Sequence, residues 1–222
     1  ISGGMDSATM LYHQLKTASY PVDAVSFNYA QRHAKELNYA EVLYHQLGVM
    51  HHIINLVDTG MMLSGSALTD YTVEVPEGHY EDESMKATVV PNRNAIMLSI
   101  AWGIAVSRGA NRVGAAMHAG DHAVYPDCRP EFASAFESTM KIATQGFGRA
   151  DLRLWTPFID KTKTEIAELG AELGVPWHKT WSCYKGEEWH CGACGTCMER
   201  REAFRDAGVN DPTHYQKEPS LA

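Results

Sequence analysis

The stretch Ser2-Gly3-Gly4-Met5-Asp6-Ser7 decides how the rest of the chain is interpreted. Two adjacent glycines allow positive φ angles and a close ligand approach, so that consecutive backbone N–H groups can converge on an anion. The following residues carry Ala8, Leu11 and Leu15 at helical spacing, with Ser7 as the expected N-cap. The hexapeptide therefore predicts an anion-binding turn at a helix N-terminus, where the helix dipole favours negative charge.

The turn differs from two common phosphate-binding motifs. No Gly-Lys-Ser/Thr follows as in a Walker A loop, and the third glycine of a dinucleotide fingerprint is absent. The hexapeptide resembles the SGGxDS loop of the PP-loop ATPases, which cleave ATP between its α- and β-phosphates. On the hexapeptide alone, an ordinary glycine turn capped by Asp or Ser remains an alternative. Because Ile1 directly precedes the turn, we expect the strand that leads into this loop to lie before Ile1.

Composition narrows the class of protein. The 222 residues are 45% hydrophobic and 21% charged, with no apolar run long enough to span a bilayer, which indicates a soluble globular protein without a membrane partner. The net charge of −8 argues against a broad nucleic-acid surface, because such binding needs Lys and Arg at phosphates. A small-molecule substrate fits better. Five cysteines without a secretory signature favour metal binding and a reducing, cytoplasmic compartment.

Strand and helix patterns alternate in the first part of the chain. Residues 22–27 read as a strand, 33–47 as a helix and 53–57 as a second strand. This alternation predicts an α/β fold, doubly wound and Rossmann-like, with a mostly parallel sheet that binds ligands at the carboxyl ends of its strands. Residues 58–90 interrupt the pattern with Gly, Ser, Pro and acidic residues, and both a lid and a solvated surface insertion fit them.

The second part of the chain resumes the alternation. Residues 91–94 open an apolar helix that we expect to be well buried, and the strand predicted at 112–117 leads into a loop, 118–129, dense in Asp, His and Arg. Further on, Thr162 and Glu165 form a capping box, which places Lys163 in a first helical turn. A cation there opposes the helix dipole, so either a different partner, such as a phosphate, holds Lys163 or the lysine is exposed and unpaired.

The cysteine pattern is the most specific local signal. Cys183, Cys191, Cys194 and Cys197 have the spacing C-x7-C-x2-C-x2-C, which suits a closed tetrahedral thiolate site. Zinc in a structural role is the leading interpretation, and an iron–sulfur cluster is the competing one, because four thiolates serve both. We therefore divide the chain into an ATP-binding α/β domain at 1–175 and a small four-cysteine zinc module at 176–222.

Taken together, the motifs resemble one family of PP-loop ATPases, the 7-cyano-7-deazaguanine synthases. The resemblance covers nearly the whole chain. It depends on the hexapeptide, residues 28–33 (Asn-Tyr-Ala-Gln-Arg-His), 91–94 (Pro-Asn-Arg-Asn), 125–129 (Tyr-Pro-Asp-Cys-Arg) and the four cysteines, in family order. The family is implied to be a C–N-forming ligase of queuosine precursor synthesis, which converts 7-carboxy-7-deazaguanine and ammonia to the nitrile with two ATP molecules and Mg²⁺.

The resemblance also implies roles for individual residues. The catalytic residues would be Asp6, Lys163 and Arg93, with Asp6 as a Mg²⁺ ligand. The ATP pyrophosphate would contact Ser2, Gly3, Gly4, Asp6, Ser7 and Lys163. The substrate ring or its carboxyl would contact Arg93, Asn94, Asp121, Asp127 and Arg129. The four cysteines would hold structural Zn²⁺.

Two other functions remain open at this point. The first is a tRNA-modifying, thiolating PP-loop enzyme, against which the acidic charge balance counts. The second is a non-catalytic nucleotide-binding regulator, which the presence of both Asp6 and Lys163 disfavours. We expect a homodimer that acts on free small molecules, with no nucleic acid bound directly.

Overall fold

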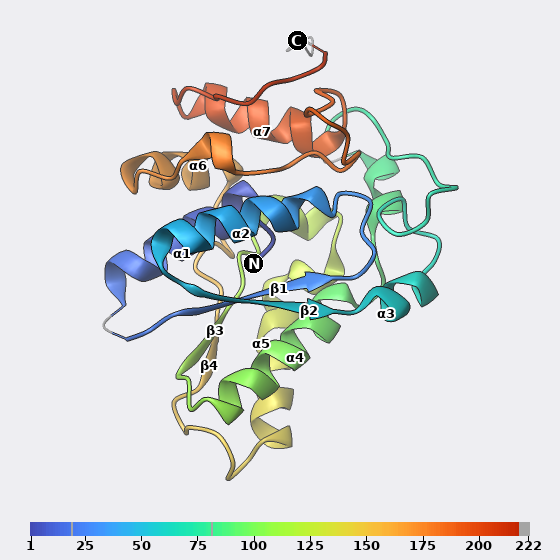
Figure 1. Cartoon of the computed structure of the whole chain (residues 1–222). Coiled ribbons are helices and arrows are strands. Elements are labelled where there is room, and N and C mark those ends of the chain that lie inside the picture. The colour runs from blue at the N-terminus through green and yellow to red at the C-terminus, as the bar shows by residue number, and fades with distance from the viewer. Residues whose placement is uncertain (19, 81, 218–222) are drawn as a thin grey trace.

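The computed structural model describes residues 1–18, 20–80 and 82–217, and it has helices on both sides of short parallel strands (Figure 1). The helices are α1 (Met5–Thr17), α2 (Lys35–Leu47), α3 (Val57–Met62), α4 (Arg93–Ser107), α5 (Pro130–Ala143), α6 (Lys163–Glu172) and α7 (Gly195–Asp206). The strands are β1 (Asp23–Asn28), β2 (Met50–Asn55), β3 (Arg112–Gly114) and β4 (Arg153–Trp155). Among the described helices, none combines the length and the hydropathy that a bilayer crossing requires.

The α/β class and the parallel strand direction are confirmed. β1 pairs with β2 in register from Asp23 with Met50 to Asn28 with Asn55, and β3 pairs with β4. Helices α1 and α2 lie on one side of the strands in Figure 1, and α4 and α5 lie on the other. Within the described residues the strands form two separate parallel pairs, β1–β2 and β3–β4, rather than one continuous sheet.

A cavity of about 910 Å³, here called the central cavity, separates the two pairs. Val25 of β1 and Val113 of β3 line it, together with residues from the loops that follow the strands. Ile1 lies between the pairs: its backbone nitrogen donates to the Val25 carbonyl, and its own carbonyl accepts the Ser26 hydroxyl. The cavity therefore reaches the carboxyl ends of the strands, where open α/β folds bind ligands.

Helix α4 is less buried than its apolar sequence predicts. Leu98, Trp102 and Ala105 are buried, whereas most of its other apolar residues are only half-buried. Met97 and Ile104 line the central cavity, and Met97 also packs against the cluster of Tyr29, Leu68 and Val90.

Strand boundaries differ from those predicted: β1 lies one residue later than 22–27, and β2 begins at Met50 instead of residue 53. β2 ends at Asn55 instead of residue 57, because the Asn55 side chain accepts the N–H of Val57 at 3.1 Å and turns the chain into α3. β3 ends at Gly114 instead of residue 117, since its partner β4 offers only three residues for pairing. Sequence periodicity shows neither the side-chain turn nor the length of the partner strand.

Helix α1 begins at Met5 with Gly4 as its N-cap, so the predicted N-cap at Ser7 is wrong. Ser7 lies within the first turn, where its hydroxyl donates to the Gly4 carbonyl at 3.1 Å. Gly3 has a φ of +85°, and a β-carbon there would lie 2.3 Å from the Glu36 carbonyl oxygen. The first glycine of the turn is therefore required both by its conformation and by the closeness of α2.

Substituting Gly3 with alanine is expected to lower the free energy of unfolding by about 2–4 kcal/mol, because strain at positive φ and overpacking against α2 add. Gly48→Ala is the matched control: Gly48 also has a positive φ, +64°, but a β-carbon at this position would meet no atom of the described neighbouring residues within 4 Å. The control is expected to cost about 1 kcal/mol. Urea unfolding of both variants measures the difference, and equal losses would contradict a steric requirement at Gly3.

The insertion at 58–90 is anchored to the rest of the protein. It contains α3 and a 3₁₀ turn at Glu83–Thr88, where the sequence pattern indicated no regular structure. The Arg32 guanidinium donates to the carbonyls of Ala67, Asp70 and Val73 at 3.0, 3.0 and 2.8 Å, respectively. Tyr80 and Met85 are buried as well. These contacts do not fit a merely solvated loop; whether the segment acts as a lid stays a prediction.

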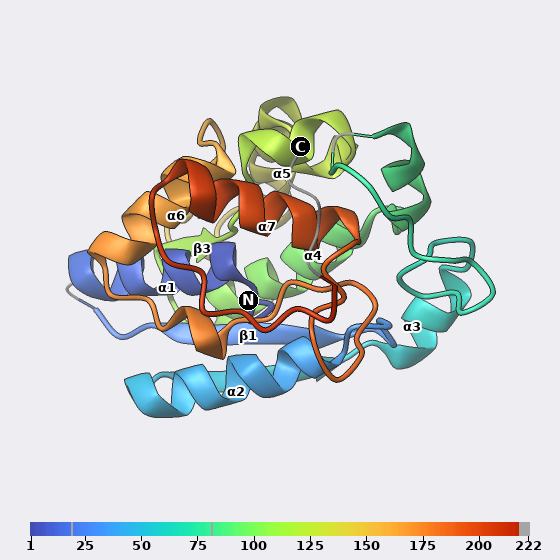
Figure 2. The same ribbon diagram turned by 90° about the horizontal axis from the view of Figure 1, so that it is seen from above.

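The C-terminal segment packs onto the ATP-binding domain proposed for residues 1–175. Helix α7 lies beside α6 in both views (Figures 1 and 2). One apolar cluster joins Met5, Leu43 and Ala167 with Trp177 and Phe204, so the proposed boundary at 175/176 passes through a shared core. Because of this packing, the helix that follows the cysteines is held close to the anion-binding turn.

Candidate functional site

The predicted anion-binding turn, residues 2–7, lines the central cavity and is ordered by its own hydroxyls. Ser2, Gly4, Asp6 and Ser7 are among the lining residues. The Ser2 hydroxyl accepts the N–H of Gly4 at 3.2 Å and lies 3.2 Å from the Ser7 hydroxyl. From the C-terminal segment, the backbone N–H of Trp181 donates to the Gly3 carbonyl at 3.0 Å. The turn is thus fixed from both sides at the end of the cavity where α1 begins.

Next to the turn, five polar residues from four segments form a group that we call the lysine cluster. The Lys163 amine donates to Asp6 at 2.7 Å and is paired with Glu199 at 3.2 Å. Its Nζ lies 3.3 Å from His118 Nε2, which is 3.4 Å from the Asp121 carboxylate. Lys163 is therefore neither exposed nor unpaired, which removes one of the two interpretations left open by the sequence.

The charges in the lysine cluster do not balance. Burial alone would raise the pKa of Asp6, but Lys163 and His118 together hold it below its usual value. Burial disfavours the charged amine, yet the carboxylates of Asp6 and Glu199 outweigh it and hold the pKa of Lys163 above its usual range. Burial raises the pKa of Glu199. One buried lysine thus faces three carboxylates, so an incoming polyphosphate needs additional positive charge here.

Asp6 offers a place for that charge. Its Oδ2 binds Lys163, while its Oδ1 is buried and has no hydrogen-bond partner among the described residues. A buried carboxylate oxygen left without a partner costs free energy, and a hard divalent cation prefers such an oxygen as a ligand. The donor at Asp6 therefore fits Mg²⁺, as the family resemblance implies.

A second group of residues, here called the arginine pocket, lines the same cavity. It comprises Tyr29, His33, Glu36, Arg93, Tyr125 and Tyr184. The Arg93 guanidinium donates to the Tyr29 hydroxyl at 3.4 Å and lies 5.8 Å from the centre of the Tyr125 ring. The Tyr125 and Tyr184 hydroxyls are 3.2 Å apart. A cation among aromatic rings suits a planar, negatively charged ligand.

The remaining predicted substrate contacts are distributed differently. Asn94 and Asp121 line the cavity, but Asp127 and Arg129 do not. Asp127 accepts the backbone N–H of Asn94 at 2.9 Å, at the start of α4, and Arg129 donates to the His122 carbonyl at 2.9 Å. The structure thus brings Arg93, Asn94 and Asp121 to one cavity and gives Asp127 and Arg129 contacts that order its walls.

Several site residues carried no recognisable sequence signal. Glu199 lies on α7, Tyr80 in the insertion, and Glu36 in the first turn of α2. Tyr80 donates to Asp121 at 3.0 Å, which connects the insertion to the lysine cluster. His118 had a weak signal, since it follows directly after a predicted strand.

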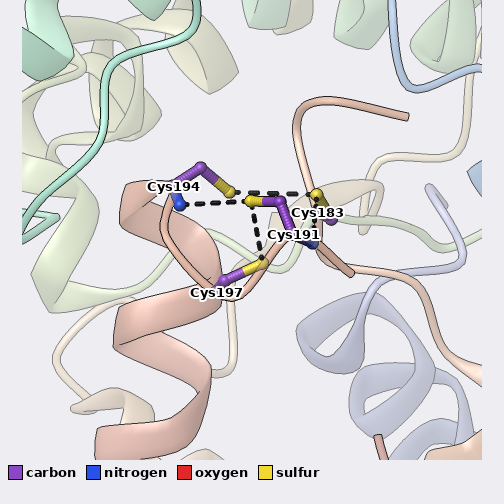
Figure 3. Close-up of side chains that lie close together, drawn as sticks. All are labelled: Cys183, Cys191, Cys194 and Cys197. Carbon is purple, nitrogen blue, oxygen red and sulfur yellow. Dashed lines mark hydrogen bonds between the residues drawn. The ribbon is translucent and has the colours of Figure 1, made fainter. Parts of the chain in front are cut away.

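The four cysteines converge on one point, and Figure 3 shows their sulfurs turned toward one another. All four are buried, and their sulfurs lie within 4.8 Å of one another, with 3.9 Å between Cys191 and Cys197 and 4.0 Å between Cys183 and Cys194. A tetrahedral ion with Zn–S bonds of about 2.3 Å places its sulfurs about 3.8 Å apart. This geometry supports the metal site that the sequence predicted at these four cysteines.

His190 stays outside the cysteine group. Its ring lies 4.2 Å from that of Trp181, and its Nε2 accepts the N–H of Ser182 at 3.1 Å. Helix α7 starts within the cysteine segment, so that Cys197 lies in its first turn and Glu199 follows two residues later. Helix α7 thus carries one residue of the cysteine site, Cys197, and one residue of the lysine cluster, Glu199.

Comparison with known proteins gives a consistent family. The family model described as "Queuosine biosynthesis protein QueC" matches residues 1–208. The chain is 51% identical to 7-cyano-7-deazaguanine synthase 1 of Mesorhizobium japonicum, over 97% of this chain and 91% of that protein. It is 54% identical to 7-cyano-7-deazaguanine synthase of Rhizobium johnstonii, over 97% and 89%, respectively.

Among solved structures, the U34-tRNA thiolase NcsA of Methanococcus maripaludis with its [4Fe-4S] cluster is a distant match. It is 13% identical, with a TM-score of 0.44 over 94% of this chain and 70% of that one.

Proposed function

Because the chain belongs to the queuosine biosynthesis protein QueC family, we propose that it is a ligase that makes 7-cyano-7-deazaguanine from 7-carboxy-7-deazaguanine and ammonia with ATP. The observation that carries the proposal is one cavity that holds both an anion-binding turn beside Lys163 and an arginine among aromatic rings. The first group suits a nucleotide's phosphates, and the second suits a planar carboxylate.

The proposed reaction has two activation steps. A carboxylate oxygen of the substrate attacks the α-phosphorus of ATP, pyrophosphate leaves, and ammonia displaces AMP from the acyl-adenylate to give an amide. The amide oxygen then attacks the α-phosphorus of a second ATP, and pyrophosphate and a proton leave to give an adenylated imidate. Loss of AMP and a second proton then leaves the C≡N group. Neither step needs a protein nucleophile, so positioning and charge stabilisation supply most of the acceleration. Cys128 does not serve as one on this proposal, since burial raises the pKa of its thiol.

Individual residues take roles that follow from their contacts. The backbone of residues 2–7 binds the pyrophosphate. The Lys163 amine, which donates to Asp6, turns toward the departing pyrophosphate. Asp6 would hold Mg²⁺ through the oxygen that Lys163 leaves free, and the ion would supply charge that offsets the three carboxylates of the lysine cluster. Arg93 binds the reacting carboxylate, with Asn94 and Asp121 beside it.

For the cysteine site we propose structural Zn²⁺. The spacing of the four sulfurs suits a single ion, whereas a four-iron cluster needs more room between its thiolates. With all four ligand positions filled by protein, the ion has no open site for catalysis.

The proposed function is tested by pyrophosphate release. The purified protein, Mg²⁺ and ATP are mixed with 7-carboxy-7-deazaguanine, with 7-deazaguanine as the matched control that lacks the carboxyl. Release is expected only with the carboxylate. Release that is independent of both compounds, or absent with both, would contradict the proposal.

We also propose that the protein is a cytoplasmic homodimer that does not bind nucleic acid directly. Sedimentation of the protein with and without tRNA tests the oligomeric state and the absence of tRNA binding.

A further inference from the structure

We propose that Glu36 recognises the amino edge of the substrate's ring, and that Arg93 holds the carboxyl at the ring's other end. This inference rests on the proposed function, because it assigns the orientation of that substrate in the arginine pocket. The family resemblance implied Asp121 and Asp127 as the carboxylates that contact the ring or its carboxyl. The structure points instead to a carboxylate that the proposed mechanism does not otherwise use.

Glu36 is a carboxylate built into the wall of the central cavity. Its side chain is 11% exposed, and one oxygen lies 3.2 Å from the Gln31 amide nitrogen and 3.5 Å from His33 Nε2. Gln31 is itself fixed, since its carbonyl accepts the N–H of Tyr29 at 2.9 Å and its amide donates to the Phe27 carbonyl at 3.1 Å. The Glu36 carboxylate is thus oriented by a Gln31 side chain that the backbone holds in place.

The surroundings of Glu36 suit a flat heterocycle. The rings of His33 and Tyr184 contact each other with their centres 5.2 Å apart and their planes inclined at 41°, and Tyr29 and Tyr125 are also in the arginine pocket. His33 Nδ1 is buried and has no hydrogen-bond partner among the described residues. Aromatic walls bind the faces of a base, and polar groups at its edge then determine which base is accepted.

The competing carboxylates are already engaged. Asp121 accepts the Tyr80 hydroxyl at 3.0 Å and lies beside His118 in the lysine cluster, while Asp127 caps α4 away from the cavity lining. Glu36 accepts a hydrogen bond from Gln31 and lies in the cavity lining, which Asp127 does not. Burial raises the pKa of Glu36 to about 7, and the Gln31 hydrogen bond and the Arg93 charge lower it only in part. Donors from a ligand would therefore stabilise the ionised form.

The chemistry of the ring matches a carboxylate. A guanine-like edge presents a ring N–H and an exocyclic amino group side by side, and the two oxygens of one carboxylate can accept both. A ring without the amino group leaves one of these oxygens unpaired in a buried site. A site built this way rejects the analogue, because unpaired buried polar groups are costly.

The assignment is tested by calorimetry in the absence of ATP, which measures the affinity for two compounds. These are 7-carboxy-7-deazaguanine and 7-carboxy-7-deazahypoxanthine, which lacks the amino group. The wild-type protein is expected to bind the first about 30-fold more tightly. Glu36→Gln is expected to bind the first about 30-fold more weakly and to lose the preference. Glu41→Gln is the matched control, since Glu41 is exposed on the same helix, and it should behave as the wild type does.

A Glu36→Gln protein that keeps the preference would overturn the assignment of Glu36 while leaving the proposed function intact. A wild-type protein that binds neither compound would overturn the proposed function and this inference with it. Should Glu36→Gln fail to fold, Glu36→Asp provides the same test, because it keeps the charge but withdraws the carboxylate by one methylene. Reduced preference in that variant supports the proposal, and wild-type preference contradicts it.

Discussion

Replacing Lys163 with methionine is expected to slow carboxylate-dependent pyrophosphate release about 100- to 1,000-fold, as loss of one preorganised cationic donor does in other sites. The amine lies 2.7 Å from Asp6 of the anion-binding turn and 3.2 Å from Glu199. Its removal leaves the three carboxylates of the lysine cluster facing the departing pyrophosphate. Because the developing charge is then repelled instead of stabilised, we expect the turnover number to fall more than substrate affinity.

Lys161→Met is the matched control for this prediction. Lys161 lies two residues earlier, and its exposed amine is paired with Glu165 at 3.9 Å, outside the cavity. Its substitution is expected to leave pyrophosphate release within about twofold of the wild type, as loss of an exposed ion pair contributes little. Thermal unfolding of both variants separates catalysis from stability. A folded Lys163→Met protein with near wild-type release would remove Lys163 from the mechanism.

Replacing Cys194 with alanine is expected to cause the largest loss of stability. Structural zinc sites contribute on the order of 10 kcal/mol of folding free energy, and loss of one of four ligands forfeits much of it. Cys194 is fully buried between Cys183 and Cys191, and the segment around it meets the insertion, because the Gly78 N–H donates to the Ala193 carbonyl at 3.1 Å. We expect low solubility or a melting temperature that falls sharply.

Cys128→Ala is the matched control, since Cys128 is also a buried cysteine but lies outside the cysteine cluster. It is expected to cost about 1–2 kcal/mol, the range for a small core deletion. Elemental analysis accompanies the unfolding measurements and should find one zinc per wild-type chain. Iron in place of zinc would show that the metal assignment is wrong. Unchanged stability of Cys194→Ala with its metal lost would contradict the structural role.

The fold could be predicted largely from local signals. Glycines, helical spacing and capping residues indicated α1, α2 and α6, and the alternation of strand and helix indicated parallel strands. The Thr162–Glu165 capping box is present as predicted at the start of α6. The errors lie where contacts outside the local sequence set the boundaries. Gly4 and not Ser7 is the N-cap of α1, and the length of β4 limits that of β3.

The candidate site was less predictable than the fold. Lys163 and Asp6 belong to motifs, so their proximity followed from the family order, and the structure shows it. Glu199 and Tyr80 carry no motif, because each reaches the site through a packing contact made far away along the chain: α7 against α6, and the insertion against the cysteine segment. Such residues are determined by three-dimensional packing and not by local spacing.

One measurement tests the central claim most directly: mass spectrometry of the product formed from 7-carboxy-7-deazaguanine, ATP, Mg²⁺ and ¹⁵N-labelled ammonium. We expect a nitrile that carries one labelled nitrogen, with two pyrophosphates released per product and a labelled amide as the intermediate at early times. Unchanged acid, or an amide that accumulates without any nitrile at excess ATP, would contradict the proposal that this cavity performs both activation steps.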